Sequence, residues 1–240
     1  MLADSLGSWE AFVSKLKDID QCWGDKEKFQ GKFRILEGRN SYVFTIRAAQ
    51  LLMDRDWQSL SKAEAHVLLG MIDDQTDYGF LGSLRAAGWV KNVFLTATAE
   101  NRQTRKIIRD AISSIPKEPL DSEFLGKVRE AYETISGEKG FGTGSTTRLL
   151  TLARPDVLIS VNSKSARKLA KQSGLKGARI KSSAGYGCLI EWVMKGGWWK
   201  GVRPETAPEQ EYWDYRAALL DALVNENLKY FENNAHLVRS

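Results

Sequence analysis

All five prolines of this 240-residue chain lie at or after Pro116, so the first half contains no residue that forbids a helix interior. Apolar side chains recur at three- and four-residue spacing through much of that half and again near the C-terminus. This period is typical of amphipathic helices. We therefore predict helices over residues 6–17, 43–54, 62–73, 78–87, 101–114, 122–135 and 209–227. The expected N-cap of the helix over 62–73 is Ser61, with Glu64 three residues later, and that of the helix over 122–135 is Asp121.

Signals for strands are scarce. Residues 42–46 and 157–161 are short apolar runs that fit either a strand or part of a helix, and residues 174–187 have the Gly, Lys and Ser content of a loop or a pair of turns. We therefore predict an all-α fold. We expect two helical lobes with a cleft between them, the first formed by residues 1–30 and 165–240 and the second by residues 40–160.

The composition excludes several classes of protein. A hydrophobic content of 42% is enough for a buried core, and no apolar run reaches the eighteen residues of a membrane span. The N-terminus lacks the basic and apolar regions of a secretory signal, so we expect a cytoplasmic protein. Two cysteines cannot form a disulfide framework, and His66 and His236 are isolated, so we expect neither a metal site nor a cofactor.

Positive charge is concentrated in one part of the chain. Residues 140–190 contain nine basic residues and a single acidic one, Asp156, whereas the rest contains 26 basic and 29 acidic residues. A cationic segment on a mildly acidic body is typical of a protein that binds a polyanion. The alternative is a solvated charged face without a partner.

The most informative segment is Gly-Phe-Gly-Thr-Gly-Ser-Thr-Thr-Arg-Leu-Leu at residues 140–150. One helix is expected to end near Ser136 and the next to begin near Ser145, so the glycines form a tight turn at a helix N-terminus, where free N–H groups suit a phosphate. A dinucleotide fingerprint would need glycine in place of Ser145, and a P-loop would need Gly-Lys-Ser/Thr. An ordinary connection between two helices stays open as an alternative.

The segment resembles the helix–hairpin–helix superfamily of DNA glycosylases, which includes endonuclease III, adenine glycosylase and alkyladenine glycosylase. Gly140 and Gly142 match the G-x-G of the hairpin, and Ser145 and Thr146 stand at the following Thr-Ala-like pair. Leu149, Leu150 and Leu152 match the apolar helix, Val161-Asn162 stands where the family has Val-Asp, and Arg167 follows five residues later. The resemblance covers about residues 122–169. It implies an all-α, two-lobed protein whose hairpin, near residues 137–150, grips the DNA backbone and whose cleft accepts a flipped base.

The resemblance also implies roles for individual residues. The expected DNA contacts are Gly140, Gly142, Gly144, Ser145, Thr146, Arg148, Lys164 and Arg167, together with Gln75, which would fill the hole left by the extruded base. A flipped base is usually stacked in a pocket. The aromatic candidates for that pocket are Tyr78, Phe80, Trp89 and Phe141, although each of them also suits a core position.

The main departure from the family is Asn162, because the family's catalytic residue at that position is an aspartate. Loss of one charge about 4 Å from an oxocarbenium ion forfeits roughly 4 kcal/mol at an effective dielectric of 20, or about a thousandfold in rate. Asn162 therefore marks either a retuned enzyme or a site that only binds. Asp74 and Asp77 are the candidate substitutes for the carboxylate, with Asp73 beside them. Gly144 stands where the lyase members have lysine, so no lyase activity is expected.

These features favour a monofunctional DNA glycosylase that releases a damaged or modified base, such as the hypermodified bases of some phage genomes. The expected partner is duplex or single-stranded DNA. A catalytically inactive helix–hairpin–helix module that binds DNA is the alternative. A nuclease or an RNA-directed protein is a third hypothesis, because a grip on the phosphate backbone does not itself select DNA.

Overall fold

The computed structural model describes residues 6–23, 34–36, 41–71, 81, 84, 86–118, 120–177 and 179–225. These residues form eleven α-helices and two 3-10 helices, and an isolated β-bridge joins Arg34 and Ser41. The all-α fold predicted from the sequence is confirmed. The helices are α2 (Trp9–Trp23), α4 (Tyr42–Gln50), α5 (Lys62–Leu69), α6 (Gly88–Leu95), α7 (Ala99–Ser113), α8 (Ser122–Gly137), α9 (Thr143–Ala153), α10 (Ser165–Ser173), α11 (Ser183–Lys195), α12 (Ala207–Asp214) and α13 (Arg216–Asn225), with the 3-10 helices η1 (Trp57–Ser59) and η2 (Arg179–Lys181).

Local hydrogen bonds account for several helix starts. Ser61 and Glu64 form the predicted capping box at α5, and the Asp121 carboxylate accepts the N–H groups of Glu123 and Phe124 at the start of α8. Each such cap satisfies backbone donors that the first turn of a helix leaves without an intrahelical partner. The N-caps predicted at Ser61 and Asp121 are therefore confirmed.

Other boundaries differ from the prediction. Residues 42–46 lie within α4, and residues 157–161 are buried without forming a helix or a strand. The helix predicted over 78–87 falls partly outside the described residues, but Leu81 has a φ of +55°, which a right-handed helix does not allow. The single helix predicted over 209–227 is divided at Tyr215 into α12 and α13.

Within residues 174–187, predicted as a loop or a pair of turns, residues 179–181 form η2 and residues 183–187 form the first turns of α11. The reason is close packing: a Cβ atom on Gly185 would lie 1.7 Å from the carbonyl oxygen of Arg179, so the glycine lets α11 meet η2 directly. Glycine is a poor helix former on its own, and here tertiary contact outweighs that cost of roughly 1 kcal/mol.

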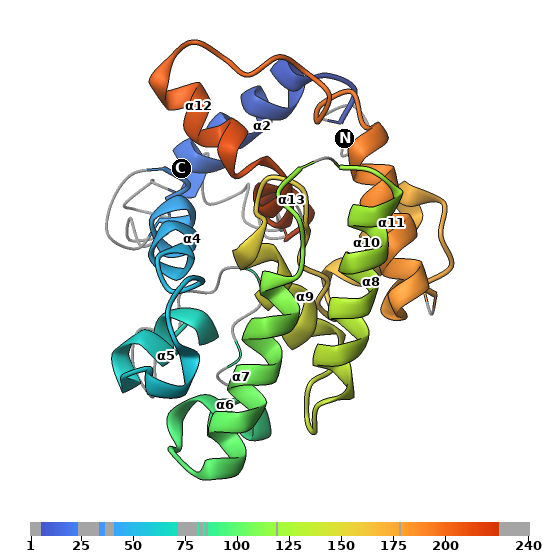
Figure 1. Ribbon diagram of the computed structural model, residues 1–240. Helices are drawn as coiled ribbons and strands as arrows, with labels where there is room; N and C mark the ends of the chain where they lie inside the picture. Colours follow the sequence, from blue (N-terminus) through green and yellow to red (C-terminus); the bar gives the residue numbers. More distant parts are fainter. Residues whose placement is uncertain are drawn as a thin grey trace, which may run out of the picture.

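Figure 1 shows α2 and α12 at one end of the molecule and α5 and α6 at the opposite end, with α8 and α11 along one side. Helix α9 lies between the two ends of the molecule and contacts α4, α8 and α13. The buried apolar side chains of all these regions form one cluster. The two-lobed division stays a prediction: α2 packs on α13 within its first lobe, but α11, assigned to the same lobe, packs along α8 of the second. Within the described residues, no helix has both the length and the apolar character needed to cross a bilayer.

Candidate functional site

The glycine-rich turn between α8 and α9 has a conformation that only glycine adopts readily. Gly140 has a φ of +85°, and a Cβ atom there would lie 2.6 Å from Cδ1 of Trp89. Trp89 therefore lies directly against the turn, with 42% of its surface exposed and the Lys139 ammonium group 3.9 Å above its ring. Both the backbone angle and the close approach of the indole require a glycine at position 140.

The first turn of α9 is open to a ligand. Gly142 precedes the helix and has no side chain to cap it, while its own N–H donates to Ser145 Oγ over 3.0 Å. A Cβ atom on Gly142 would meet no atom within 4 Å, so there is free space in front of this helix end. Uncapped N–H groups and the positive end of the helix dipole together favour an anion.

Three residues expected to contact DNA have buried side chains: Ser145, Thr146 and Arg148 are 5%, 0% and 0% exposed. The Arg148 guanidinium lies in the interior, where its Nε donates to the Leu68 carbonyl oxygen over 2.9 Å. The expectation that Arg148 contacts DNA is therefore wrong, because a fully buried side chain cannot reach a phosphate. Ser145 and Thr146 support the turn from inside, whereas Gly142 is exposed and Thr143 and Gly144 are half-buried.

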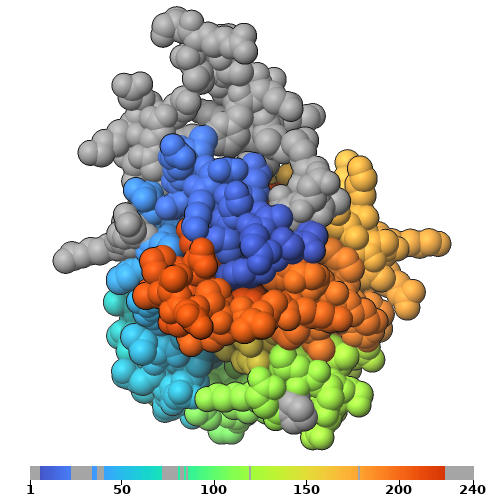
Figure 2. Space-filling view, turned by 90° about the horizontal axis from the view of Figure 1, so that it is seen from above, coloured from blue at the N-terminus to red at the C-terminus, as the bar shows by residue number. Residues whose placement is uncertain are grey.

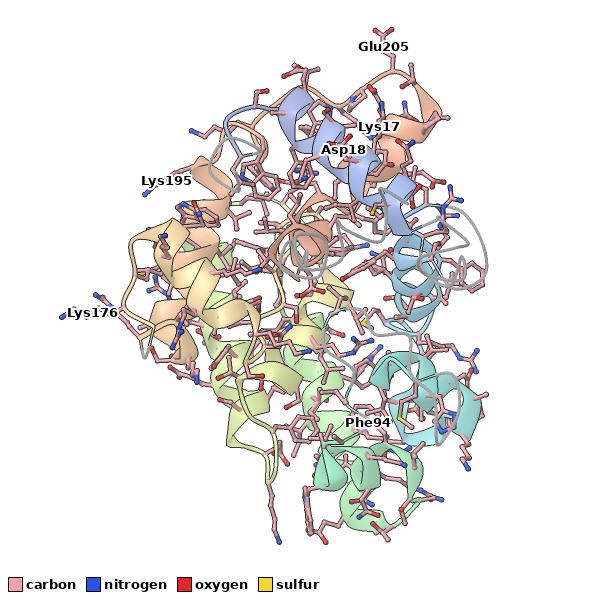
Figure 3. All side chains as sticks on the ribbon, turned by 180° about the vertical axis from the view of Figure 1, so that it is seen from behind. Lys17, Asp18, Phe94, Lys176, Lys195 and Glu205 are labelled. Atoms are coloured by element: carbon pink, nitrogen blue, oxygen red, sulfur yellow. The ribbon has the colours of Figure 1, made fainter. Side chains whose placement is uncertain are left out.

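A cationic surface, formed by exposed basic residues at the start of α10, along α10, before η2 and in η2, lies next to this turn. Its members make no ion pair within the described part of the chain: Lys164, Arg167, Lys171, Lys176, Arg179 and Lys181. Several basic side chains elsewhere are paired, as in Lys106–Asp110 and Lys127–Glu130. Figure 3 shows Lys176 extending away from the molecule.

The turn and the cationic surface are joined by hydrogen bonds. The hydroxyl groups of Thr143 and Tyr132 both donate to the carbonyl oxygen of Lys181, over 3.3 and 2.6 Å. On the other side of the turn, a Cβ atom on Gly144 would lie 4.0 Å from the carbonyl oxygen of Val161, the residue before Asn162. The open end of α9 therefore lies between Lys181 and the start of α10.

Asn162 caps α10. Its Oδ1 accepts the N–H groups of Lys164 and Ser165, each over 2.9 Å, and its own N–H donates to Ser165 Oγ over 2.9 Å. The other end of the side chain, Nδ2, donates to Oδ1 of Asp221 on α13 over 3.4 Å. Both ends of the Asn162 amide thus have defined partners, and Lys164 and Arg167 are held on the exposed side of the same helix start.

Asp221 is a buried carboxylate, 4% exposed. Its Oδ2 accepts the Tyr42 hydroxyl over 2.5 Å and the N–H of Leu81 over 3.0 Å. Burial, with the negative charge of Asp221 as a second cause, raises the pKa of Tyr42 well above its ordinary value, so the phenol stays protonated and donates. The cluster of Asn162, Asp221 and Tyr42 thus contains one carboxylate that accepts hydrogen bonds from Asn162, Tyr42 and Leu81.

Leu81 lies between this cluster and Ser160. Its positive φ of 55° is unusual for a residue with a Cβ atom, and two hydrogen bonds hold it, one to Asp221 and one from Ser160 Oγ to its carbonyl oxygen over 3.0 Å. Such strain, of about 1–3 kcal/mol, persists where surrounding contacts impose it and is common at functional sites.

Sequence reasoning missed Asp221, although a signal was present. It is the only charged residue in the run Ala-Ala-Leu-Leu-Asp-Ala-Leu-Val at 217–224, whose members are all buried. A helix that is apolar on every side is a core helix, and a carboxylate inside it needs hydrogen-bonding partners. The partner, however, could not be identified from the sequence.

The other predicted residues fall into two groups. Asp73, Asp74, Gln75, Asp77, Tyr78 and Phe80 lie outside the described residues, and the expectations for them stay predictions. Phe141 is 5% exposed and packs against Phe94 with ring centroids 6.4 Å apart, so its side chain belongs to the core rather than to a base pocket. Asp156 forms a bidentate ion pair with Arg154 over 2.9 and 2.8 Å, which is a structural role.

A groove of about 510 Å³ lies at the end of the molecule seen in Figure 2, where α2 lies against the segment that leads into α12. It contains none of the residues predicted from the sequence to form the site. Its lining consists of Trp9, Glu10, Val13, Ser14, Lys17, Val202, Pro204, Glu205 and Glu209. In the described part of the chain, no three His, Cys, Asp or Glu side chains gather in a way that could hold a metal ion.

Comparison of the chain with protein-family models, with curated proteins and with solved structures found no match. The candidate site therefore has to be interpreted from its own geometry and charge.

Proposed function

We propose that this protein is a monofunctional DNA glycosylase that extrudes a damaged or modified base and hydrolyses its N-glycosidic bond. In this reaction the C1′–N bond breaks with its electron pair leaving on the base, which takes up a proton. A water oxygen bonds to C1′ and gives up a proton, and an abasic site is left. The transition state carries positive charge on the sugar, so a nearby negative charge stabilises it.

The observation that carries the proposal is the position of Asn162. It follows Val161, whose carbonyl oxygen faces Gly144 of the turn, and it caps α10 beside the exposed Lys164 and Arg167. An open helix N-terminus, exposed cations without ion pairs and a buried carboxylate are thus close together. The first two suit the phosphate backbone, and the third suits a cationic sugar.

The chain itself suggests the type of reaction and the range of bases to test. Gly144 carries no amine, so the turn offers no lysine for a Schiff base at that position, which favours simple hydrolysis. Asn162 in place of the family's aspartate indicates a retuned site, so naturally hypermodified bases such as those of phage DNA belong among the substrates beside damaged bases.

A catalytically inactive DNA-binding module is the second candidate, and one observation favours it. Both ends of the Asn162 side chain are engaged inside the protein: Oδ1 accepts from Lys164 and Ser165, and Nδ2 donates to Asp221. The same set of residues would then serve only to hold α10 and its cations in place.

Base release distinguishes the two candidates. Duplex and single-stranded DNA containing single damaged or modified bases, including glucosylated hydroxymethylcytosine, is incubated with the protein and scored for alkali-labile abasic sites. Asn162→Ala tests the site, and Lys127→Gln on α8, where the lysine is paired with Glu130, is a control remote in sequence. A glycosylase gives alkali-dependent breaks at one base that Asn162→Ala reduces and Lys127→Gln preserves. Salt-sensitive binding with no base released from any substrate would replace the proposal with the binding module.

A further inference from the structure

The site contains an unusual pair: an amide at position 162 and a carboxylate at position 221, joined by a 3.4 Å hydrogen bond. We propose that Asp221 carries the negative charge of this site and that Asn162 is an amide because Asp221 already stands beside it. Asp221 is here a positioning and electrostatic residue, acting on the reacting sugar through space and through the Asn162 amide. The inference rests on the proposed function, because it names the group that supplies the charge.

The orientation of the Asn162 amide follows from its partners. Two backbone N–H groups approach one end of the side chain, and donors can only meet the amide oxygen. The NH₂ group must therefore be at the other end, where it meets a carboxylate, which can only accept when it is ionised. Both ends are matched in this one orientation, and the reverse orientation would oppose donors to donors and acceptors to acceptors.

An aspartate at position 162 would conflict with this arrangement. Two carboxylates about 3.4 Å apart cannot both be ionised at low cost, and such a pair shares a proton with one strongly raised pKa. The pair Asn162–Asp221 avoids this conflict and keeps one full charge. The resemblance implies an aspartate at position 162, before α10, whereas in this protein the carboxylate is at position 221 on α13.

The surroundings of Asp221 suit an ionised carboxylate. Among the described residues, Tyr42 of α4 donates to it, and Arg148 of α9 is close enough to Tyr42 to act on its pKa. On α10, Lys168 Nζ donates to the Val224 carbonyl oxygen, one turn further along α13. The buried residue of α12 is Tyr212, and the buried side chains of α2, which also packs on α13, are all apolar: Trp9, Phe12, Val13, Leu16 and Ile19.

Exchange of the two residues tests the proposal in the full chain. Asp221→Asn removes the charge, N162D adds a second one, and the double variant N162D/D221N returns a single carboxylate at the opposite position. Asp214→Asn on neighbouring α12 removes an exposed carboxylate that pairs with Arg203, and it is the matched control.

Single-turnover base release measures the role of the charge. Asp221→Asn is expected to lower the rate by on the order of a hundredfold to a thousandfold, and N162D/D221N to recover it to within about tenfold of the original protein. Asp214→Asn should leave the rate unchanged. A merely structural role would not be reversed by moving the carboxylate, so an unchanged rate in Asp221→Asn, or a double variant as slow as Asp221→Asn, overturns the proposal.

Urea unfolding from pH 4 to pH 8 tests the charge without relying on activity. In N162D the folded state holds a shared proton with a raised pKa, so its stability should match that of the original protein near pH 4 and fall as the pH rises. N162D/D221N should lose this pH dependence. If N162D tracks the original protein at every pH, Asp221 is not an ionised neighbour of position 162 and the inference is wrong.

Failure of the proposed function and failure of the inference about Asp221 give different results. If the original protein releases no base, the proposed function fails and the catalytic half of the inference fails with it, while the unfolding measurements still decide whether the charge is on Asp221. If Asp221→Asn does not fold, N162D and the double variant still give a result, because they keep at least one carboxylate in the cluster.

Discussion

The guanidinium group of Arg148 occupies the space next to the backbone of Gly70 that any side chain at position 70 would need. A Cβ atom on Gly70 would lie 2.5 Å from the Nη2 atom of Arg148, and Gly70 has a φ of +72° as the C-cap of α5. The same arginine donates to the Leu68 carbonyl oxygen near the end of that helix. The buried Arg148 side chain of α9 therefore packs against the C-terminus of α5 and donates a hydrogen bond to it. This contact joins the helix that follows the glycine-rich turn to α5.

Gly70→Ala is expected to reduce the free energy of unfolding by at least about 1–2 kcal/mol, because an L-residue in the left-handed region is strained and because Arg148 must also move. Gly126→Ala is the matched control: it lies within α8, and its Cβ atom would meet nothing within 4 Å. The free energy of unfolding of this control should rise by roughly 0.5–1 kcal/mol, because alanine has a higher helix propensity than glycine. Urea unfolding of both variants measures the difference, and equal stabilities would contradict the close packing of Gly70 and Arg148.

Neutralising single members of the cationic surface should change the salt dependence of DNA binding. Lys164→Gln, Arg167→Gln and Lys181→Gln are each expected to reduce the slope of log K against log salt by about 1, since each removes one phosphate contact. Lys127→Gln, whose lysine is paired with Glu130, should leave the slope unchanged. Fluorescence anisotropy at several salt concentrations gives the slopes. If the slopes of all three variants equal that of Lys127→Gln, this surface does not contact DNA.

A negative charge at the open end of α9 should block an anion without disturbing the fold. Gly142 has a φ of −107° and free space around its Cβ position, so Gly142→Glu fits the backbone and projects into the region in front of the helix. We expect DNA affinity to fall by about tenfold or more, while the unfolding midpoint stays within error. Gly126→Glu makes the same change of charge at another open position. Equal affinities of the two variants would argue against a phosphate at the turn.

The buried tyrosines predict a loss of stability in alkaline solution. Burial raises the pKa of Tyr42, and likewise that of Tyr186, which donates to the Ile159 carbonyl oxygen. A pKa raised in the folded state means that the stabilisation is complete below the unfolded value near 10 and is lost as the pH rises towards the folded value.

Tyr42→Phe should therefore make the decline in stability above pH 10 shallower, and Tyr186 would account for part of the remaining slope. At pH 7 the same variant should lose about 1–3 kcal/mol, because the buried Asp221 carboxylate loses a donor. Urea unfolding at pH 7, 9 and 11 measures both effects. A decline as steep as that of the original protein would contradict the raised pKa of Tyr42.

Local features of this protein could be predicted from the sequence because their causes are local. The capping residues Ser61 and Asp121, the turn that begins at Gly140 and the cationic composition of residues 140–190 depend on neighbours a few positions away. Backbone hydrogen bonding, the left-handed conformation of glycine and charge density act at that range. The all-α class follows from the same local information.

Other features were decided only by tertiary structure. Arg148 was expected to contact phosphate, but it is buried in the core. The close contact between Gly185 and Arg179 allows a helix in a segment whose composition favoured a loop. Asn162 and Asp221 are 59 positions apart in the chain, and only the packing of α10 on α13 brings them together. Whether a polar side chain faces solvent or a buried partner depends on which helices pack together, and the pattern of a single segment does not contain that information.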